Sequence, residues 1–282
     1  MQDMPLVGRA LWGRLLRNRS FVIGALLVLL MIAVAVAADW LTPFDPLKSN
    51  VRARLAAPGT IHWFGTDHFG RDILSRVMIG ARISLAIGAL TAVLAGIAGT
   101  LSGAIAGYFY RLDQPIMRIM DALMAFPSIV LAMVVSAVLG ASLTNVVIAL
   151  AIATTPHTAR IVRASVLLEK EQEYIAAARS IGVGEWTILF KHVLRNVAGP
   201  LIVRLTYVFA IAVLAEAALS FVGAGPPPPA ASFGSIIAQG RDFMREAPWI
   251  TVFPGLAIII CVLGLNLLGD GLRDVLDPRL KF

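Results

Sequence analysis

The side chains best suited to bind a metal lie in one polar stretch, HWFGTDHFGRD at residues 62–72. His62, Asp67 and His68 offer the nitrogen and oxygen atoms that zinc takes as ligands, but no third-ligand spacing supports such a site. We therefore expect no metal here. Thr66 and Asp67 are instead expected to cap and turn the chain, because short polar side chains bond readily to nearby backbone amides.

Catalysis and nucleotide binding need other patterns, which the sequence lacks. No Ser/His/Asp arrangement and no pair of carboxylates stands out, so we expect a chain that is not an enzyme. The sequence has no G-x-x-x-x-G-K-[ST] phosphate loop, so it cannot hold ATP in that way. Cys261 is the only cysteine, and its apolar surroundings predict a small buried hydrophobe.

Two acidic residues lie in or beside apolar stretches. Glu216 is an intramembrane acid, a kind of residue that is often functional. It is expected either to face a polar pathway or to pair with a basic residue such as Arg82, and we favour the ion pair. Asp121 follows Arg118 by three residues, a spacing that predicts a local ion pair on one helix.

These residues must be positioned by an unusually apolar chain. Of its 282 residues, 58% are hydrophobic and only 15% are charged, far from the composition of a soluble domain. An all-α polytopic membrane protein is the class that fits. The net charge of +7 comes from basic residues dispersed between apolar stretches, so we assign it to membrane topology and expect no nucleic-acid partner.

Six stretches are long and apolar enough to cross a bilayer, which takes about 20 residues each. One uncharged run of 38 residues is too long for a single helix and is expected to break at Gly140–Asn145. Pro127 and Pro156 fall within the two resulting spans and predict kinks, either at a gate or from ordinary packing. The predicted spans are residues 21–38, 83–110, the two parts of 122–159, 200–222 and 249–269.

The distribution of basic residues predicts the orientation of the chain in the membrane. Sixteen of the 24 Lys and Arg fall on one side of the membrane if both termini lie in the cytoplasm, and cytoplasmic segments carry the excess of positive charge. The first span resembles a signal peptide, but its length favours an uncleaved anchor. The expected division is a cytoplasmic segment 1–20, a first span 21–38, a periplasmic segment 39–82, and a five-helix core 83–282 with a cytoplasmic loop 161–197 and a short tail 270–282.

Two short patterns predict how helices pack and where the chain protrudes. Gly99, Gly103 and Gly107 recur every four residues, which lets two helix backbones approach closely in lipid. Residues 173–192, EYIAAARSIGVGEWTILFKH, form a polar insert between two spans. Tyr174, Ala177, Ala178 and Ile181 share one face of a short helix, and Gly182 is expected to end it.

A second helix is expected to start near Trp186 and to lie along the membrane interface. The small face of the first helix would fit a groove in a soluble partner. Its spacing is equally compatible with an ordinary cytoplasmic loop, which we favour slightly on spacing alone.

The insert resembles the EAA loop of the inner-membrane permeases of binding-protein-dependent ABC importers. The general pattern has Glu where this chain has Ala176, Ile where it has His192, and Pro where it has Arg195. The form found in the dipeptide, oligopeptide and nickel branch matches better, although its Pro is also replaced by Arg195. The positions that match this form are Glu173, Tyr174, Ala177, Ala178, Arg179, Gly182, His192, Leu194 and Asn196.

Further motifs extend the resemblance to the C-type subunit of that branch over nearly the whole chain. They are HWFGTDHFGRD after the first span, GARISL at the start of the second, EAALSFVG at the end of the fifth, and NLLGDGLRDVLDP at the C-terminal end. The loop PPPPAASFG departs from the family by carrying Phe233 in place of Trp.

The resemblance implies a type I ABC importer permease fold with six transmembrane helices in a bacterial inner membrane. It implies a heterodimer with a homologous B-type permease, two ATPase subunits that bind ATP and Mg, and a periplasmic substrate-binding protein. The residues expected to couple this chain to an ATPase are Glu173, Tyr174, Ala177, Ala178, Arg179, Ile181 and Gly182.

The expected substrate is a dipeptide or oligopeptide, and ATPase closure would drive alternating access. Pro127, Pro156, Asp121 and Glu216 are candidates for structural or pathway roles. The same fold could carry nickel chelates, glutathione or opine-like solutes, and the motifs do not distinguish these. A secondary transporter is the alternative from another class, but the sequence shows no inverted repeat.

Overall fold

The computed structural model describes residues 13–276. Residues 1–12 and 277–282, which hold part of the predicted N-terminal segment and tail, lie outside the described residues. The described part is mostly helical, and its first long helix, α2 (Arg19–Leu41), is apolar between Phe21 and Ala38. Asn18 begins α2 by accepting a hydrogen bond from the backbone amide of Phe21 at 3.0 Å.

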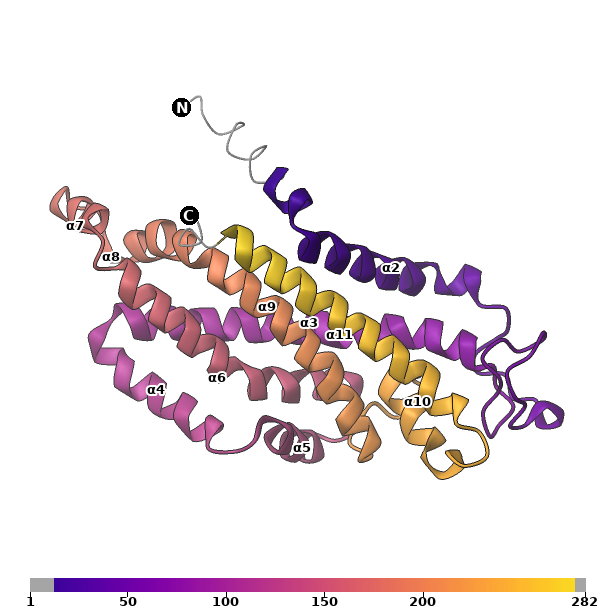
Figure 1. The fold of residues 1–282 in the computed structure, drawn as a ribbon. Coiled ribbons are helices and arrows are strands. Elements are labelled where there is room, and N and C mark those ends of the chain that lie inside the picture. The colour runs from indigo at the N-terminus through magenta and orange to yellow at the C-terminus, as the bar shows by residue number, and fades with distance from the viewer. Residues whose placement is uncertain (1–12, 277–282) are drawn as a thin grey trace.

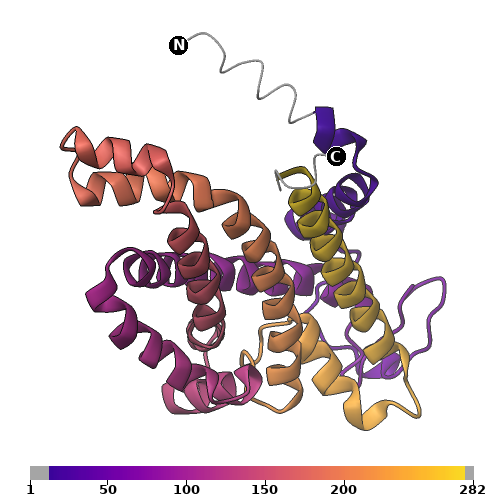
Figure 2. The ribbon, with the colours of Figure 1, turned by 60° about the vertical axis from the view of Figure 1, so that its left-hand side comes forward.

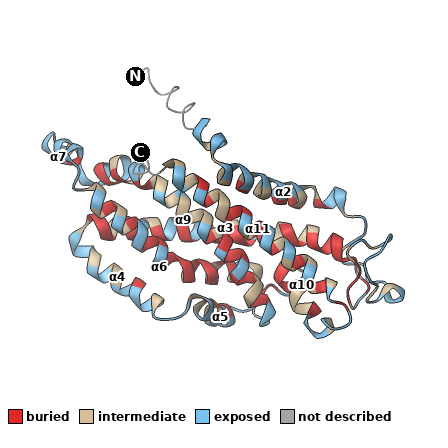
Figure 3. Cartoon of the chain, viewed as in Figure 1, coloured by how far each residue is buried: buried red, intermediate tan, exposed pale blue. Residues whose placement is uncertain are grey.

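Helices α3 (Ile73–Tyr108) and α6 (Leu143–Glu169) form the centre of the bundle (Figure 3). The predicted glycine stripe lies between them. A Cβ atom on Gly103 would stand 2.3 Å from the carbonyl oxygen of Ala159, and one on Gly99 would stand 2.7 Å from Cβ of Thr158. The two backbones are therefore in direct contact, as the four-residue spacing predicts.

The third expected span bends far more sharply than the kink predicted at Pro127. It consists of α4 (Tyr110–Met124) and α5 (Ser128–Leu139), which meet at an angle of 90° (Figure 1). Pro127 lies in the break and not within a helix, because proline lacks the amide hydrogen and disfavours helical backbone in the preceding residue. Pro156, in contrast, lies inside α6 as predicted.

The chain breaks again where the sequence predicts, between α5 and α6. Gly140 takes a positive φ of 87°, and the side chain of Ser142 accepts a hydrogen bond from the amide of Asn145 to begin α6. Asn145 in turn donates to the carbonyl oxygens of Leu139 and Gly140. The turn thus satisfies the end of one helix and the start of the next.

The polar insert forms α7 (Glu173–Ser180) and a short turn, α8 (Glu185–Thr187). The chain continues through a π-helical turn (Ile188–Val193) into α9 (Leu194–Phe221), so that Glu185–Phe221 counts as one helix of 37 residues. The second helix is not separate as predicted, because no break divides it from the fifth span, and its position along the membrane interface stays a prediction. Only residues 170–184 of the expected loop 161–197 lie between the two long helices.

The remaining helices are the short α10 (Phe233–Gly240), a turn at Arg241–Phe243, and α11 (Trp249–Leu276). Among the described residues, five helices are long and apolar enough to cross a membrane, or six if the bent pair counts as one. Asn18 donates a hydrogen bond to Asp274 at 3.1 Å, so the start of α2 and the end of α11 lie together. Figures 1 and 2 place them at the end of the bundle that carries α7, opposite the loop that precedes α3.

Candidate functional site

Helix α7 projects from one end of the bundle and exposes most of its surface (Figures 1 and 2). Ile181, at its end, is 81% exposed, and Tyr174 is 40% exposed. Ala177 is also exposed, whereas Ala178 is partly buried. The predicted face of α7 therefore combines outward and inward positions, and its outward part is apolar or small.

One residue that the helical spacing did not single out fixes α7 to the bundle. Ile175 is fully buried in a cluster with residues from α3, α6 and the start of the long helix that contains α9. These partners include Tyr108, Val166, Ile188, Leu189 and Val193. Burying an isoleucine side chain contributes roughly 1.5–3 kcal/mol, so Ile175 is the main apolar anchor of this short helix.

Polar side chains fix α7 at two further points. The Tyr174 hydroxyl contacts Glu169 and accepts a hydrogen bond from Asn196 at 2.8 Å, and partial burial together with Glu169 raises the pKa of Tyr174 to about 12. Arg179 donates to Glu185 at 2.8 Å. Tyr174 and Arg179, which the family pattern marks as coupling residues, thus make contacts within this chain.

Glycine at position 182 is required by the backbone. Gly182 has φ of +82°, a conformation that residues with a Cβ atom rarely adopt. No atom of the described structure lies within 4 Å of a Cβ placed there, so conformation and not crowding selects glycine. Val183 donates its amide to the carbonyl of Ala178 at 3.1 Å, which closes the helix end as predicted.

The sequence analysis did not identify the residues that hold α7 against the bundle. Glu185 contacts the hydroxyl of Tyr108 from a position 77 residues away along the chain, and no local pattern links the two. Trp186 and Phe190 are 57% and 46% exposed and stack with ring centroids 6.0 Å apart. They extend the exposed apolar surface beside α7.

The predicted ion pair of Glu216 is wrong. Arg82 pairs with Asp39 at 3.0 Å, while Glu216 is fully buried and surrounded by hydroxyl groups. Ser220 and Ser232 each donate to its carboxylate at 2.7 Å, and Ser84 lies at 3.5 Å. These serines belong to α9, the cap of α10 and α3, so Glu216 joins three elements through hydrogen bonds that a charged carboxylate can accept.

Asp121 also has a different partner from the one predicted. Its carboxylate accepts a hydrogen bond from Arg160 of α6 at 2.6 Å. A second pair, Asp113 with Arg163 at 2.5 Å, lies further along the same contact between α4 and α6. The pair predicted within α4 is wrong because α4 packs its charged face against α6, where Arg160 is closer in space than a neighbour in sequence.

The polar stretch before α3 forms a hydrogen-bond network at the opposite end from α7, in which His68 Nδ1 and Arg76 Nε have no partner among the described residues. Asp67 is fully buried and accepts hydrogen bonds from the backbone amides of Phe69 and Arg71, which confirms its predicted role in a turn. Its carboxylate also contacts the guanidinium groups of Arg71 and Arg76. Among the described residues, no group of three His, Cys, Asp or Glu is placed to hold a metal ion.

Comparison with known proteins matches two family models to this chain. Residues 95–282 match the model for "Binding-protein-dependent transport system inner membrane component". Residues 7–58 match "N-terminal TM domain of oligopeptide transport permease C". The two models together cover α2, α3 from residue 95 onward, and everything that follows α3.

Several curated relatives are similar over almost the full length. A Brucella abortus protein, provisionally named a peptide transport system permease protein, is 54% identical over 95% of this chain and 90% of its own. The dipeptide transport system permease protein DppC of Alkalihalophilus pseudofirmus is 43% identical over 97% and 90%. The glutathione transport system permease protein GsiD of Pectobacterium atrosepticum is 44% identical over 97% and 91%.

A solved structure shares the fold. It is a chain of the MetNI methionine ABC transporter in an inward-facing conformation, with a TM-score of 0.59 and 21% identity. The match covers 72% of this chain and 96% of the other. The expected type I ABC importer permease fold is thereby confirmed.

Proposed function

This chain belongs to the family of binding-protein-dependent inner membrane components and is a permease of an ABC importer, and we propose that its substrate is a dipeptide or oligopeptide. Relatives with 43–54% identity over at least 95% of the chain are named for peptide, dipeptide and glutathione transport. Glutathione is itself a tripeptide and stays within this class. The nickel-chelate alternative has less support, since none of the relatives described above is named for nickel.

The observation that carries the mechanism is the exposed surface of α7. Ala177 and Ile181 face outward from a helix whose inner side is fixed by Ile175. A small, apolar, rigidly mounted helix end suits a groove in a soluble protein. In this proposal the groove belongs to an ATPase subunit, which binds ATP and Mg, and this chain performs no hydrolysis.

Movement of α7 would be transmitted directly to the two long helices that flank it. The last residue of α6 is Glu169, and α7 begins at Glu173, while the long helix containing α9 begins at Glu185. Closure of two ATPase subunits would therefore displace two spans at once and exchange the two bundle arrangements that give alternating access. A homologous B-type permease would complete the pathway as a heterodimer.

The orientation follows from the same assignment. The α7 end would face the cytoplasm of a bacterium, and both termini would lie on that side of the inner membrane, since α2 begins and α11 ends there. The loop before α3 and helix α10 would face the periplasmic binding protein. The excess of Lys and Arg in the segments assigned to the cytoplasm agrees with this orientation.

The test of docking is a charge placed on the outward face of α7. Ala177→Asp and Ile181→Asp should abolish ATP-dependent uptake and co-purification of the ATPase while leaving the permease inserted in the membrane. Ala176→Asp is the matched control, because Ala176 is exposed on the other face and the family pattern tolerates an acid there. Uptake by Ile181→Asp at the wild-type rate would contradict the docking role of α7.

The test of substrate uses the reconstituted complex with its binding protein. Dipeptides, tripeptides, longer peptides, glutathione and a nickel chelate are compared for stimulation of ATP hydrolysis. Peptides should stimulate hydrolysis only when the binding protein is present. Stimulation by the nickel chelate alone would replace the peptide assignment.

A further inference from the structure

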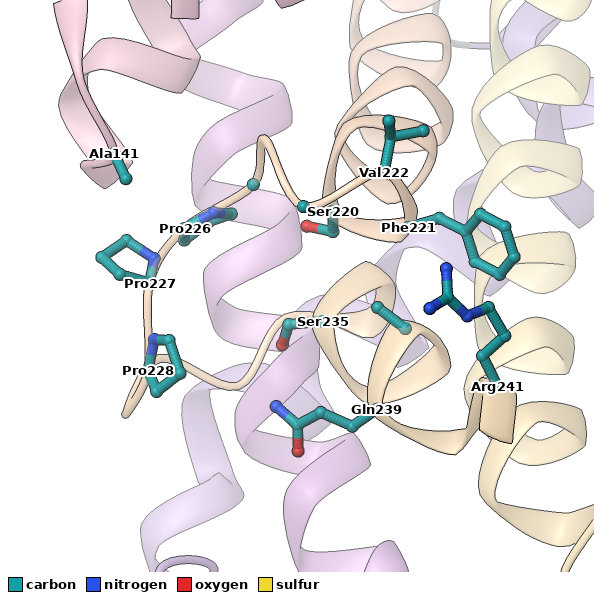
Figure 4. A pocket seen from close by; sticks show the side chains of 13 residues that line it. Ala141, Ser220, Phe221, Val222, Pro226, Pro227, Pro228, Ser235, Gln239 and Arg241 are labelled. Carbon is teal, nitrogen blue, oxygen red and sulfur yellow. The ribbon is translucent and has the colours of Figure 1, made fainter. Parts of the chain in front are cut away.

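A hollow of about 460 Å³ opens at the end of the bundle opposite α7 (Figure 4). Its walls are the end of α9, the proline loop that follows, and the outer side of α10. Pro226, Pro227 and Pro228 form one side of it, and Phe221 lies at the other. This volume falls in the range of about 300–1,000 Å³ typical of small-molecule sites.

Hydrogen-bond donors face this hollow from α10 and the turn after it. Gln239 accepts a hydrogen bond from Arg71 at 2.8 Å through its side-chain oxygen. Because arginine can only donate, the amide nitrogen of Gln239 is left on the other side, toward the proline loop in Figure 4. Among the described residues, no partner accepts a hydrogen bond from that nitrogen.

The charge in the hollow is positive. Arg241 lies over the ring of Phe221, with 5.7 Å from the guanidinium carbon to the ring centroid. Its only carboxylate contact among the described residues is from Nε to Asp242 at 3.4 Å, which leaves both terminal nitrogens able to donate. None of the described residues that line the hollow is acidic.

We propose that this hollow binds the carboxylate end of a short peptide, with the carboxylate on Arg241 and a peptide carbonyl oxygen on Gln239. A guanidinium group binds a carboxylate through two parallel hydrogen bonds, and the apolar proline loop leaves room for side chains. None of the described lining residues is an acid that could pair with the ammonium group of a peptide. The peptide should therefore bind in one orientation, with its carboxylate end in the hollow. This inference rests on the proposed function, since it supplies a receiving site for the peptide on the outer side of the permease.

The experiment measures protection of a cysteine in the wall of the hollow. Val222 lines the hollow and is 61% exposed, and Cys261 is 1% exposed and shielded from polar reagents. Val222→Cys is introduced into the assembled importer in spheroplasts and labelled with an uncharged maleimide carrying a polyethylene glycol chain. Dialanine is the probe, and dialanine amide, which lacks the carboxylate, is the matched control.

Dialanine at about twice its dissociation constant should slow labelling about threefold by mass action, and the amide should not. Adding Arg241→Gln should raise the dissociation constant about tenfold or more, because a charge-assisted hydrogen bond is lost, so the same dialanine concentration should slow labelling only about 1.2-fold. Arg245→Gln removes a nearby exposed charge that does not line the hollow and should leave protection unchanged. Equal protection by acid and amide, no protection by either, or protection unaffected by Arg241→Gln overturns the proposal.

A separate uptake experiment tests whether the transported substrate is a peptide. Uptake of radiolabelled dialanine is measured in the same spheroplasts with the binding protein and without the introduced cysteine. Uptake without carboxylate-dependent protection contradicts this site and leaves the proposed substrate standing. Protection without uptake of any peptide contradicts the proposed substrate and leaves a carboxylate-binding hollow.

Discussion

The two ends of the bundle differ in how far their charged side chains are buried. In the loop before α3, Asp67 is fully buried and takes hydrogen bonds from two arginines and two backbone amides. At α7, the pair Arg179–Glu185 is about half exposed, and Ile181 is 81% exposed. The first end buries its ion pairs, and the second leaves its ion pair half in solvent; both ends also expose apolar side chains, Trp63 in the loop and Ile181 at α7.

The difference lies in how far each charged side chain is buried. A buried charge without compensation costs several kcal/mol, so Asp67 and its arginines had to be satisfied inside the fold. An exposed apolar residue at a helix end contributes little to folding, so Ile181 has no comparable internal role. Four changes below test how strictly the two ends are divided, from the largest expected effect on stability to the smallest.

Removal of Asp67 should have the largest effect. Asp67→Ala leaves Arg76, which is 2% exposed, without a carboxylate and should lower the free energy of unfolding by about 3–5 kcal/mol. Thermal unfolding of the purified complex measures it. Asp39→Ala, which breaks an exposed pair with Arg82, should cost less than about 1 kcal/mol. Equal losses in both variants would remove the distinction between buried and exposed ion pairs.

The pH dependence of the Asp67 contribution follows from its pKa. Burial alone would raise the pKa, but the amide of Arg71 and the charges of Arg76 and Arg71 outweigh burial and hold the pKa of Asp67 below its usual value. A lowered carboxyl pKa stabilises the fold above the unfolded value of about 3.9. That stability is lost only as the pH falls below it, through the folded pKa, so the Asp67 contribution should be constant near neutral pH.

Within α7, substitution of an inner residue should affect stability, and substitution of an outer residue should affect binding of the ATPase. Ile175→Ala opens a cavity under the helix and should cost about 2 kcal/mol, toward the low end for isoleucine because the short α7 can settle into the space. Ile181→Ser should leave stability nearly unchanged while weakening ATPase binding. Limited proteolysis between α6 and α9 reports the first effect, and co-purification reports the second. Faster proteolysis of both variants would show that Ile181 supports the fold.

Glu216 should show an intermediate effect at the outer end. Glu216→Leu leaves the hydroxyls of Ser220 and Ser232 without their acceptor and should cost about 1–3 kcal/mol, since each buried donor loses its partner. Glu216→Gln retains one acceptor oxygen and should cost less. Thermal unfolding of the purified complex gives the ranking. A loss for Gln as large as for Leu would mean that the charge matters more than the hydrogen bonds.

The smallest effect should come from His68. Burial lowers the pKa of His68 more than the charge of Asp67 raises it. The unfolded chain then takes up a proton near pH 6.5 and the folded chain only at a lower pH, so stability should fall as the pH drops from about 7 through the unfolded value. His68→Phe, which preserves stacking on Phe243, should flatten the dependence. Melting temperatures measured across this range decide it, and an unchanged slope would exclude His68.

Local patterns in the sequence predicted a large part of this arrangement. The apolar stretches, the glycine stripe of α3, the helix at 173–180 and the turn at Gly182 all depend on residues within a few positions of one another. Glycine spacing in particular predicted a contact between helices, because only close backbones need it.

Partners distant in sequence were not predictable in the same way. Asp121 and Arg160 are 39 residues apart, and Glu216 and Ser84 are 132 apart. The expected pairs with Arg118 and Arg82 used sequence proximity or charge alone, whereas packing of α4 on α6 and of α9 on α3 decided the outcome. The 90° bend at Pro127 was missed because a proline in an apolar run predicts a kink without giving its angle.

The glycine contact between α3 and α6 also determines what can move. With Gly99 and Gly103 pressed against the backbone of α6, neither helix can slide along the other without collision. The two helices should therefore move as one rigid body. Helix α7 follows the end of α6 after a connection of three residues. In the proposed mechanism, a displacement of α7 would therefore move α6 and α3 together.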